Sequence, residues 1–376
     1  MERSKEIEFQ DKRLIPIWEK VEKGKRIGKK EGLLLFQTWD IIALGKIADF
    51  VKRKKVNGSS GLSGDAVYFI IDRQINPTNL CIYSCRFCDF AVRSWDERAY
   101  EMSIEEILSK LSPEIREVHI VGGLHPQWRF EDYLNILREI KTHYPTIQIK
   151  AWTAVEIAHF SKISKIPVEE IFERLLEAGL NTLPGGGAEV FSERMRRALF
   201  KQKIGEKEWL RIHRIAHRMG IRTNATLLYG HMESYEERVD HLLKLRRLQE
   251  ETGGFLTFIP LAFQVGHTGI VERQASALED LRTLAASRLL LDNFHHIKAY
   301  WVMLGEETAG VGLHFGADDI AGTIGEERIA HAALARSPVG LTRERILDLI
   351  KGAGRIPVER DAYFNILQVY DGDRKW

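Results

Sequence analysis

Three cysteines are the residues whose type and spacing most clearly indicate chemistry. Cys81, Cys85 and Cys88 are the only cysteines of the chain and form a Cys-x3-Cys-x2-Cys pattern. An odd number of cysteines so close together is a poor disulfide framework, whereas closely spaced cysteines often bind metal. Three thiolates can ligate three irons of a cubane and leave the fourth iron with an open position. We therefore predict a site-differentiated [4Fe-4S] cluster on this loop.

The open iron position predicts a second ligand. Such an iron can chelate the amino and carboxylate groups of S-adenosylmethionine, and one electron from the cluster can then cleave the sulfonium C–S bond to give a 5′-deoxyadenosyl radical. Two alternatives stay open, a zinc site and a set of buried free thiols. A zinc site would need a fourth Cys or His at the spacing typical of zinc fingers, and the sequence after Cys88 lacks one.

Glycines and glutamates follow several apolar stretches after the cysteine loop. Gly122 and Gly123 carry no side chain, so their backbone can approach a ligand closely. Glu156 and Glu189 are candidates to bind ribose hydroxyls or the ammonium group of the cofactor. The alternatives are an ordinary tight turn for the glycines and, for each glutamate, a helix N-terminal position stabilised by the helix dipole. His125 is either a ligand-facing donor or a loop-packing residue.

The pattern around these residues indicates alternating strands and helices. Short apolar runs occur at residues 66–71, 118–121, 147–154, 182–183, 223–228, 255–260 and 296–302, and amphipathic helical patterns at 103–111, 130–142, 168–178, 206–219, 235–251 and 276–291. With a weaker eighth strand at 312–315, they predict an α/β fold, a (β/α)8 TIM-type barrel with its active site at the carboxyl ends of the strands. His295 and His296 are adjacent on a predicted strand, so we expect one in the core and the other in the lumen.

The chain outside the barrel also has a predicted organisation. Residues 1–64 are expected to be an N-terminal helical extension, which ends in a linker-like stretch at 57–64 that is rich in glycine and serine. Residues 65–376 are expected to contain the barrel and a C-terminal helical tail.

Composition limits the class of protein. With 55 Lys and Arg against 53 Asp and Glu, the formal net charge is +2, so no global field attracts nucleic acid or an acidic membrane. The charged N-terminus has no apolar signal core, and no apolar run reaches the roughly 18 residues of a membrane span. We expect a cytoplasmic enzyme with a small-molecule substrate and no nucleic-acid partner. A non-enzymatic zinc- or RNA-binding protein would have a basic face and more Cys or His.

Several motifs resemble the menaquinone-type group of radical S-adenosylmethionine enzymes, which includes aminofutalosine synthases, dehypoxanthine futalosine cyclases and deazaflavin synthases. The shared motifs lie at 76–79 (Asn-Pro-Thr-Asn), 122–126 (Gly-Gly-Leu-His-Pro), 150–157 (Lys-Ala-Trp-Thr-Ala-Val-Glu-Ile) and 183–189 (Leu-Pro-Gly-Gly-Gly-Ala-Glu). Later stretches at 224–233, 322–331 and 356–361 favour the synthases over the cyclases. The resemblance runs from about residue 30 to 370. Asp89, after the third cysteine, departs from the small residue usual there.

The resemblance implies a reaction and its participants. Phe87 would lie near the adenine, and Gly122 and Gly123 would contact the methionine amino group of the co-substrate S-adenosylmethionine. The adenosyl radical would add to the enol-ether double bond of 3-[(1-carboxyvinyl)oxy]benzoate, an aromatic dicarboxylate. Rearrangement through the aromatic ring and loss of the carboxylate carbon would then give 6-amino-6-deoxyfutalosine on the futalosine route to menaquinone. A flavodoxin- or ferredoxin-type reductant would supply the electron. A cyclase would instead begin by hydrogen abstraction from a nucleoside-like substrate.

The two carboxylates of such a substrate require local cations in a nearly neutral protein, because an unpaired carboxylate in a dry cavity is costly. Arginine matches a carboxylate with two parallel hydrogen bonds. We predict Arg360, within the 356–361 motif, as a substrate contact. The alternative is a salt bridge from Arg360 to Glu359 or Asp361 that anchors the C-terminal tail.

Overall fold

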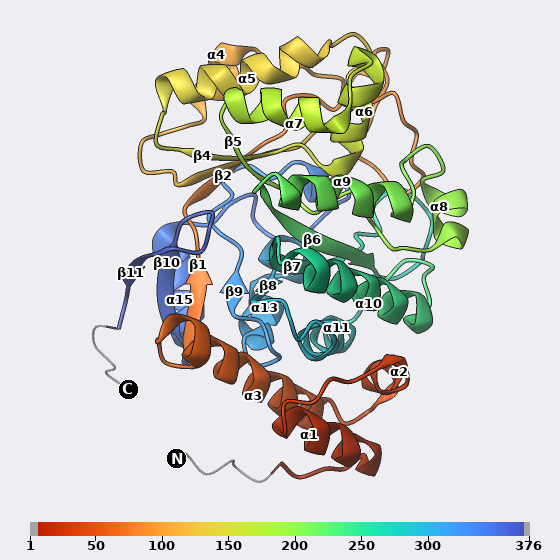
Figure 1. Cartoon of the computed structure of the whole chain (residues 1–376), viewed down its shortest axis with the longest axis vertical. Coiled ribbons are helices and arrows are strands. Elements are labelled where there is room, and N and C mark those ends of the chain that lie inside the picture. Colours follow the sequence, from red (N-terminus) through yellow and green to blue (C-terminus); the bar gives the residue numbers. More distant parts are fainter. Residues whose placement is uncertain (1–6, 372–376) are drawn as a thin grey trace.

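The computed structural model describes residues 7–371, and its framework is one curled sheet (Figure 1). Neighbouring strands follow the order β11-β10-β1-β9-β8-β7-β6-β5-β4-β3-β2, and every pair except β10 with β11 is parallel. The strands are β1 (Ala66–Phe69), β2 (Asp72–Ile75), β3 (Glu117–Ile120), β4 (Gln148–Ala151), β5 (Leu180–Leu183), β6 (Arg222–Tyr229), β7 (Phe255–Ala262), β8 (His296–Ala299), β9 (Asp319–Ile320), β10 (Ile356–Arg360) and β11 (Ile366–Val369).

The two ends of the curl meet in residues 66–75. The first half of this segment, β1, pairs with β9 through Tyr68 opposite Asp319, and the second half, β2, pairs with β3. Counted once, the segment and β3 to β9 give eight strand positions around the curl. The predicted α/β barrel of the superfamily is therefore confirmed as a curled parallel sheet.

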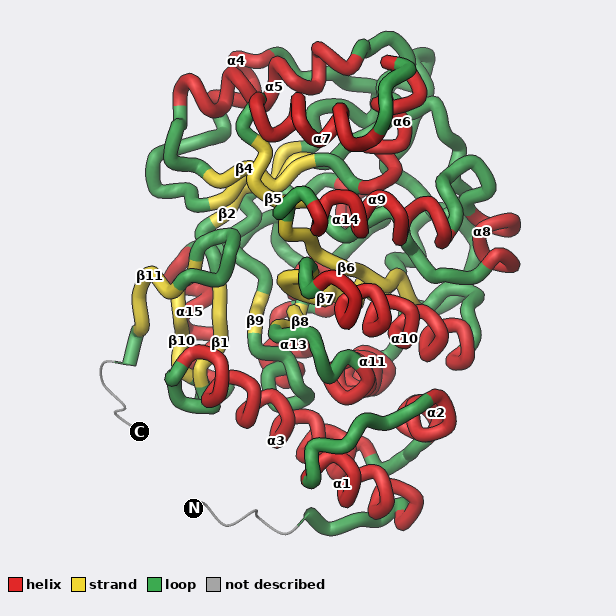
Figure 2. Tube along the Cα trace, viewed as in Figure 1, coloured by secondary structure: helices red, strands yellow, loops and turns green. Residues whose placement is uncertain are grey.

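Helices cover the outer face of the curl (Figure 2). Each helix covers the sheet because one of its faces is apolar. In α5, for example, the buried residues Phe130, Tyr133, Leu134 and Leu137 recur at the spacing of one helical face. The helices after the first strands are α4 (Ile104–Ser109), α5 (Phe130–His143), α6 (Ala154–Ser164), α7 (Val168–Glu177), α8 (Glu193–Leu199), α9 (Glu206–Arg218), α10 (Tyr235–Thr252), α11 (Ala277–Leu290), α12 (Trp301–Leu304), α13 (Glu306–Gly312), α14 (Ile329–Ala332) and α15 (Arg343–Gly352).

The N-terminal segment is helical, as predicted, with η1 (Lys12–Leu14), α1 (Ile15–Glu22), α2 (Lys29–Gln37) and α3 (Ile41–Ser60). Helices α2 and α3 pack against α10 and α11 on one side of the curl (Figure 1). The linker expected at 57–64 is partly wrong, because residues 57–60 form the last turn of α3, which ends at Gly61 with a left-handed φ of 68°. Residues 1–6 of this segment lie outside the described part, and the division at residue 64 stays a prediction.

The C-terminal tail contains more strand than the sequence indicated. Within the described residues after β9, two short helices, α14 and α15, are followed by β10 and β11, which extend the sheet beside β1. The loop between these strands reaches the amino ends of other strands: the Ala362 N–H donates to Gln148 Oε1 at 2.6 Å, and the Tyr363 hydroxyl donates to the Asn181 carbonyl at 3.2 Å. This loop covers the end of the curl opposite the carboxyl ends of its strands. Residues 372–376 lie outside the described part.

The eighth strand was predicted at the wrong place. Gly312 is the last residue of α13, and residues 313–316 form a turn in which Leu313 and Phe315 are buried. The eighth position is taken by β9, which contains Asp319. A four-residue apolar run cannot be distinguished from a helix end by periodicity, and a two-residue strand with an aspartate has no apolar pattern. Within residues 7–371, no helix has the length and apolar character needed to cross a membrane.

Candidate active site

The cysteine loop follows β2 at the carboxyl end of the curl. The Cys81 N–H donates to the Val92 carbonyl at 3.2 Å, and the Ile82 N–H donates to the Leu124 carbonyl at 2.9 Å. All three thiols are partly buried. Burial raises the pKa of Cys85 to about 11, and burial also raises the pKa of Cys88. Without a metal the thiols of Cys85 and Cys88 would stay protonated at neutral pH, whereas a coordinated iron would deprotonate them.

The arrangement of the donors distinguishes a cluster from a single ion. Within the described residues, no three His, Cys, Asp or Glu side chains converge to hold one metal ion. A structural zinc site requires four ligands around one ion. A cubane takes one thiolate on each of three irons, so its sulfurs need not meet at one metal. The loop carries the three thiolates that such a cubane needs.

Gly122 and Gly123 hold the backbone that leads into the cysteine loop. The Gly123 N–H donates to the Thr78 carbonyl at 2.9 Å. A Cβ at Gly123 would lie 2.1 Å from the Leu80 carbonyl oxygen, and one at Gly122 would lie 2.9 Å from the Thr78 oxygen. Both positions require glycine for this close approach. Their contact with S-adenosylmethionine stays a prediction.

Glu156 lies at the third position of α6, next to the glycine turn. Its carboxylate accepts the backbone N–H of Thr153 at 2.6 Å and that of Gly122 at 3.3 Å. Burial raises the pKa of this carboxyl to about 7. Glu156 therefore occupies a position in the first turn of a helix, which was the alternative to cofactor binding. A direct contact of Glu156 with the cofactor stays a prediction.

Glu189 has a partner that the sequence analysis missed. Lys203 lies 2.6 Å from Glu189 Oε1, and its ammonium group lies 4.9 Å from the centre of the Phe87 ring. Burial alone would lower the pKa of Lys203, but Glu189 and then Cys85 hold it above its usual value. Lys203 comes from a loop without any motif, so only the folded chain reveals it. This pair places a cation and a carboxylate beside the cysteine loop.

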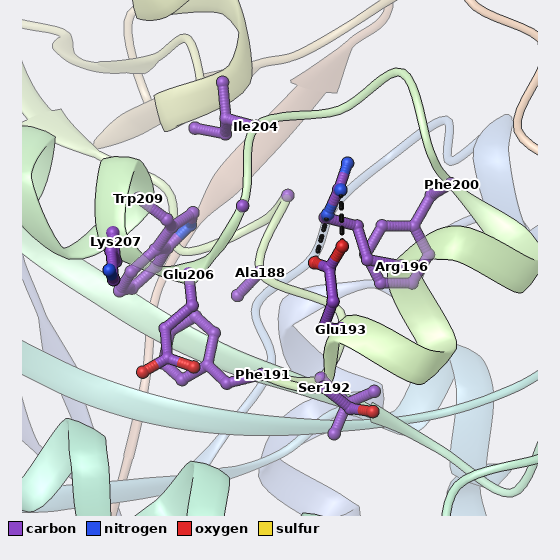
Figure 3. A pocket seen from close by; sticks show the side chains of 13 residues that line it. Ala188, Phe191, Ser192, Glu193, Arg196, Phe200, Ile204, Glu206, Lys207 and Trp209 are labelled. Carbon is purple, nitrogen blue, oxygen red and sulfur yellow. Dashed lines mark hydrogen bonds and ion pairs between the residues drawn. The ribbon is translucent and has the colours of Figure 1, made fainter.

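A cavity of about 500 Å³ opens next to this pair, between the loops at residues 187–193 and 200–207 (Figure 3). On one side, Arg196 donates to both oxygens of Glu193, at 2.7 and 2.8 Å. On the other, Trp209 Nε1 donates to the Gly186 carbonyl at 3.2 Å. The cavity is bounded by the two loops that carry Glu189 and Lys203.

His125 packs its own loop. Its Nδ1 accepts the backbone N–H groups of Gln127 and Trp128, both at 3.2 Å, and its ring stacks on Trp128. The loop-packing alternative therefore describes His125.

The two adjacent histidines only partly follow the prediction. His295 is exposed, so the expectation that the pair divides between core and lumen is wrong. His296 Nδ1 lies 2.8 Å from Asp318 Oδ2 and its ring stacks on Phe364. The strand begins at His296, so alternation of side chains does not extend to His295.

Arg360 lies at the end of the curl opposite the cysteine loop. Its Nη2 is 2.8 Å from Asp319 Oδ2, its Nη1 donates to the Asp361 carbonyl, and the guanidinium lies over the Phe364 ring. The salt bridge is to Asp319 and not to the carboxylates of Glu359 or Asp361. These contacts hold the C-terminal hairpin to the curl, and a substrate contact stays a prediction.

Solved structures of other proteins share this fold. The [FeFe]-hydrogenase maturase HydG from Carboxydothermus hydrogenoformans superposes with a TM-score of 0.69 at 17% identity, over 94% of this chain and 80% of that one. Methylornithine synthase (PylB) also gives 0.69, at 18% identity over 91% and 97%. The model of the radical SAM superfamily matches residues 75–245, and that of the CofH/MqnC C-terminal region matches 252–371. Fold and cysteine loop together define a radical S-adenosylmethionine enzyme.

Full-length relatives narrow this class. The aminodeoxyfutalosine synthase of Thermus thermophilus is 46% identical over 96% of this chain and 98% of its own length, and that of Streptomyces coelicolor is 40% identical over 94% of each. The cyclic dehypoxanthine futalosine synthase of Streptomyces coelicolor is 35% identical over 95% of this chain and 90% of its own length. The chain belongs to the radical SAM family that contains the aminodeoxyfutalosine synthases.

Proposed function

We propose that the chain adds the adenosyl part of S-adenosylmethionine to the alkene of 3-[(1-carboxyvinyl)oxy]benzoate. Rearrangement through the aromatic ring and loss of the enol carboxylate carbon then give 6-amino-6-deoxyfutalosine, a step of the futalosine route to menaquinone. The observation that carries this proposal is the 46% identity over 96% of the chain to the Thermus thermophilus synthase. The cyclic dehypoxanthine futalosine synthase shares fewer residues over a similar length, at 35%.

The cysteine loop is the centre of the proposed site. When bound there, a [4Fe-4S] cluster would supply the electron that cleaves the sulfonium bond, and a flavodoxin- or ferredoxin-type protein would reduce it. Cys81, Cys85 and Cys88 would hold the cluster on a loop that is tied by backbone hydrogen bonds to residues 92 and 124. The chain's main tasks are then to hold two substrates in register and to exclude water.

The surroundings of the loop suggest how S-adenosylmethionine is bound. The backbone at Gly122 and Gly123 lies against residues 78–80, which lead into the loop, and its carbonyls are proposed to meet the methionine end. Phe87 belongs to the loop itself and is proposed to lie against the adenine. Glu156 and Glu189 are buried carboxylates nearby, suited to hydroxyl or ammonium partners.

The products formed from S-adenosylmethionine test the proposal. Anaerobically reconstituted enzyme with a chemical reductant should convert 3-[(1-carboxyvinyl)oxy]benzoate to a nucleoside that carries the adenosyl group, with methionine formed in equal amount and little free 5′-deoxyadenosine. Mass spectrometry with label in the adenosyl group measures this directly. If the enol-ether benzoate were inert and dehypoxanthine futalosine were converted instead, the chain would be a cyclase.

A further inference from the structure

Inside the curl, polar side chains of neighbouring strands form one row. His119 of β3 is opposite Lys150 of β4, and Lys150 is opposite Thr182 of β5. Residues in register project from the same face of a sheet. Lys298 of β8 lies four strands away in the sheet order, yet Lys150 contributes to lowering its pKa, after burial and Arg360. Strands so far apart in order can only interact across the interior, so the row faces the lumen.

These side chains retain unused hydrogen-bonding capacity. Nε2 of His119 and Oγ1 of Thr182 are buried and have no partner among the described residues. Lys150 and Lys298 are each 6% exposed, and each makes one ion pair in the described part, Lys150 with Glu117 at 2.5 Å and Lys298 with Asp319 at 3.3 Å. An ammonium group carries three donors, so donors are left over.

His119 can act as a neutral donor. Burial, followed by the charge of Lys150, lowers the pKa of His119 to about 3. The imidazole is then uncharged at neutral pH and offers one N–H without a further charge to be desolvated. Neutral donors between two ammonium groups suit an anion with several acceptor lone pairs, and a carboxylate is such an anion.

The depth of the row indicates which part of a substrate would reach it. His119 precedes Gly122 by three residues, which corresponds to about 10 Å along an extended chain. In the proposed reaction the alkene carbon must lie against the adenosyl group near the cysteine loop. The enol carboxylate is attached to that alkene, whereas the ring carboxylate is at the far end of the molecule and would extend deeper into the lumen.

We propose that His119, Lys150, Thr182 and Lys298 bind the ring carboxylate of the aromatic substrate. This inference rests on the proposed function, because it takes its ligand from it. Glu117 and Asp319, paired with the two lysines, hold the ammonium groups in place and reduce the net charge of the row. Arg360 and Lys298 share Oδ2 of Asp319, so Arg360 acts through this carboxylate and does not itself contact the substrate. The competing explanation is that ordered water fills the unpaired positions.

Binding without turnover tests this assignment. The holoenzyme with S-adenosylmethionine and no reductant would be titrated calorimetrically with 3-[(1-carboxyvinyl)oxy]benzoate and with its ring methyl ester. Lys298→Met should raise the Kd of the acid about 10- to 100-fold, the range for hydrogen bonds to charged groups, and leave the Kd of the ester unchanged. Lys52→Met is the matched control, because Lys52 is also fully buried but donates to the Gly64 carbonyl from α3. It should leave both affinities unchanged.

His119→Leu is a second test variant, which keeps the assignment testable if Lys298→Met does not fold. Nε2 of His119 has no partner among residues 7–371, so its removal breaks no hydrogen bond that the structure describes, and the melting temperature should stay unchanged. Its affinity for the acid should fall and that for the ester should not. If both variants bound the acid like the wild type, or lost acid and ester equally, water would fill the row and the assignment would be wrong. A wild-type enzyme that neither bound nor converted the acid would instead refute the proposed function.

Discussion

Gly123→Ala offers the sharpest test of how the cysteine loop is positioned. The added methyl group would lie 2.1 Å from the Leu80 carbonyl oxygen and 2.7 Å from its carbonyl carbon. Both atoms belong to the backbone directly before Cys81, so no side-chain rotation can relieve the contact.

The size of the effect follows from this distance. A carbon approaches a carbonyl oxygen to about 3.3 Å, so the two backbones must separate by about 1.2 Å. That separation opposes the hydrogen bond from the Gly123 N–H to the Thr78 carbonyl, 2.9 Å long, and displaces the chain that carries the first cysteine. Overpacking of this kind costs about 1–3 kcal/mol of folding free energy. A misplacement near 1 Å at reacting groups lowers turnover by roughly 100-fold.

Iron content and thermal unfolding measure the two consequences separately. Gly123→Ala should bind less iron after anaerobic reconstitution and melt at a lower temperature than the wild type. Gly58→Ala is the control, because a Cβ at Gly58, within α3, meets no atom within 4 Å. It should keep its iron and gain about 0.5–1 kcal/mol from helix propensity. A Gly123→Ala protein with full iron content and the wild-type melting temperature would refute the reasoning.

Three further predictions address the cluster, the buried carboxyl and the C-terminal hairpin. The wild type should hold about four irons per chain, and Cys85→Ala should lose iron and activity together; a colourless wild type with one zinc would contradict this. Because burial raises the pKa of Glu156 from 4.5 to about 7, its folded form favours the proton, so stability should fall by up to about 3 kcal/mol as pH rises from 4.5 through 7. Denaturant unfolding of Glu156→Gln should lack this slope, and an unchanged slope would exclude Glu156 as its source. Arg360→Lys keeps the ion pair to Asp319 but loses the planar contact with Phe364, so it should melt lower with an unchanged KM; a raised KM at constant melting temperature would make Arg360 a substrate contact.

Local patterns explain why much of the site could be predicted. The three cysteines lie within one short loop, and glycine residues at the end of a strand indicate a close approach of the backbone to its surroundings. The alternation of apolar and amphipathic stretches likewise indicated the parallel sheet, because each strand and each helix produces its own periodicity. These signals need no knowledge of which segments meet in space.

The remaining features depend on contacts between distant segments. Lys203 meets Glu189 only because the loop after α8 folds back beside the cysteine loop. The strands β10 and β11 were missed because β11 is exposed throughout and β10 ends in two buried charged residues, Glu359 and Arg360, so neither has an alternating pattern. Propensity cannot anticipate a strand that is defined by its neighbour in the sheet.

Arg360 and Lys150 show that a residue in a family motif does not have to lie where the substrate binds. Both lie in stretches that mark the family resemblance, and the arginine was chosen because its fork suits a carboxylate. The fold places Arg360 at the covered end of the curl, where the Asp361 carbonyl and Asp319 pair with its Nη1 and Nη2. Lys150 lies in the lumen beside the unpaired His119, on the strand that leads towards Glu156 and the cofactor loops. Side-chain chemistry alone favoured the arginine, whereas position along the strands favours the lysine, because Lys150 lies nearer than Arg360 to the carboxyl ends, where the substrate would be held.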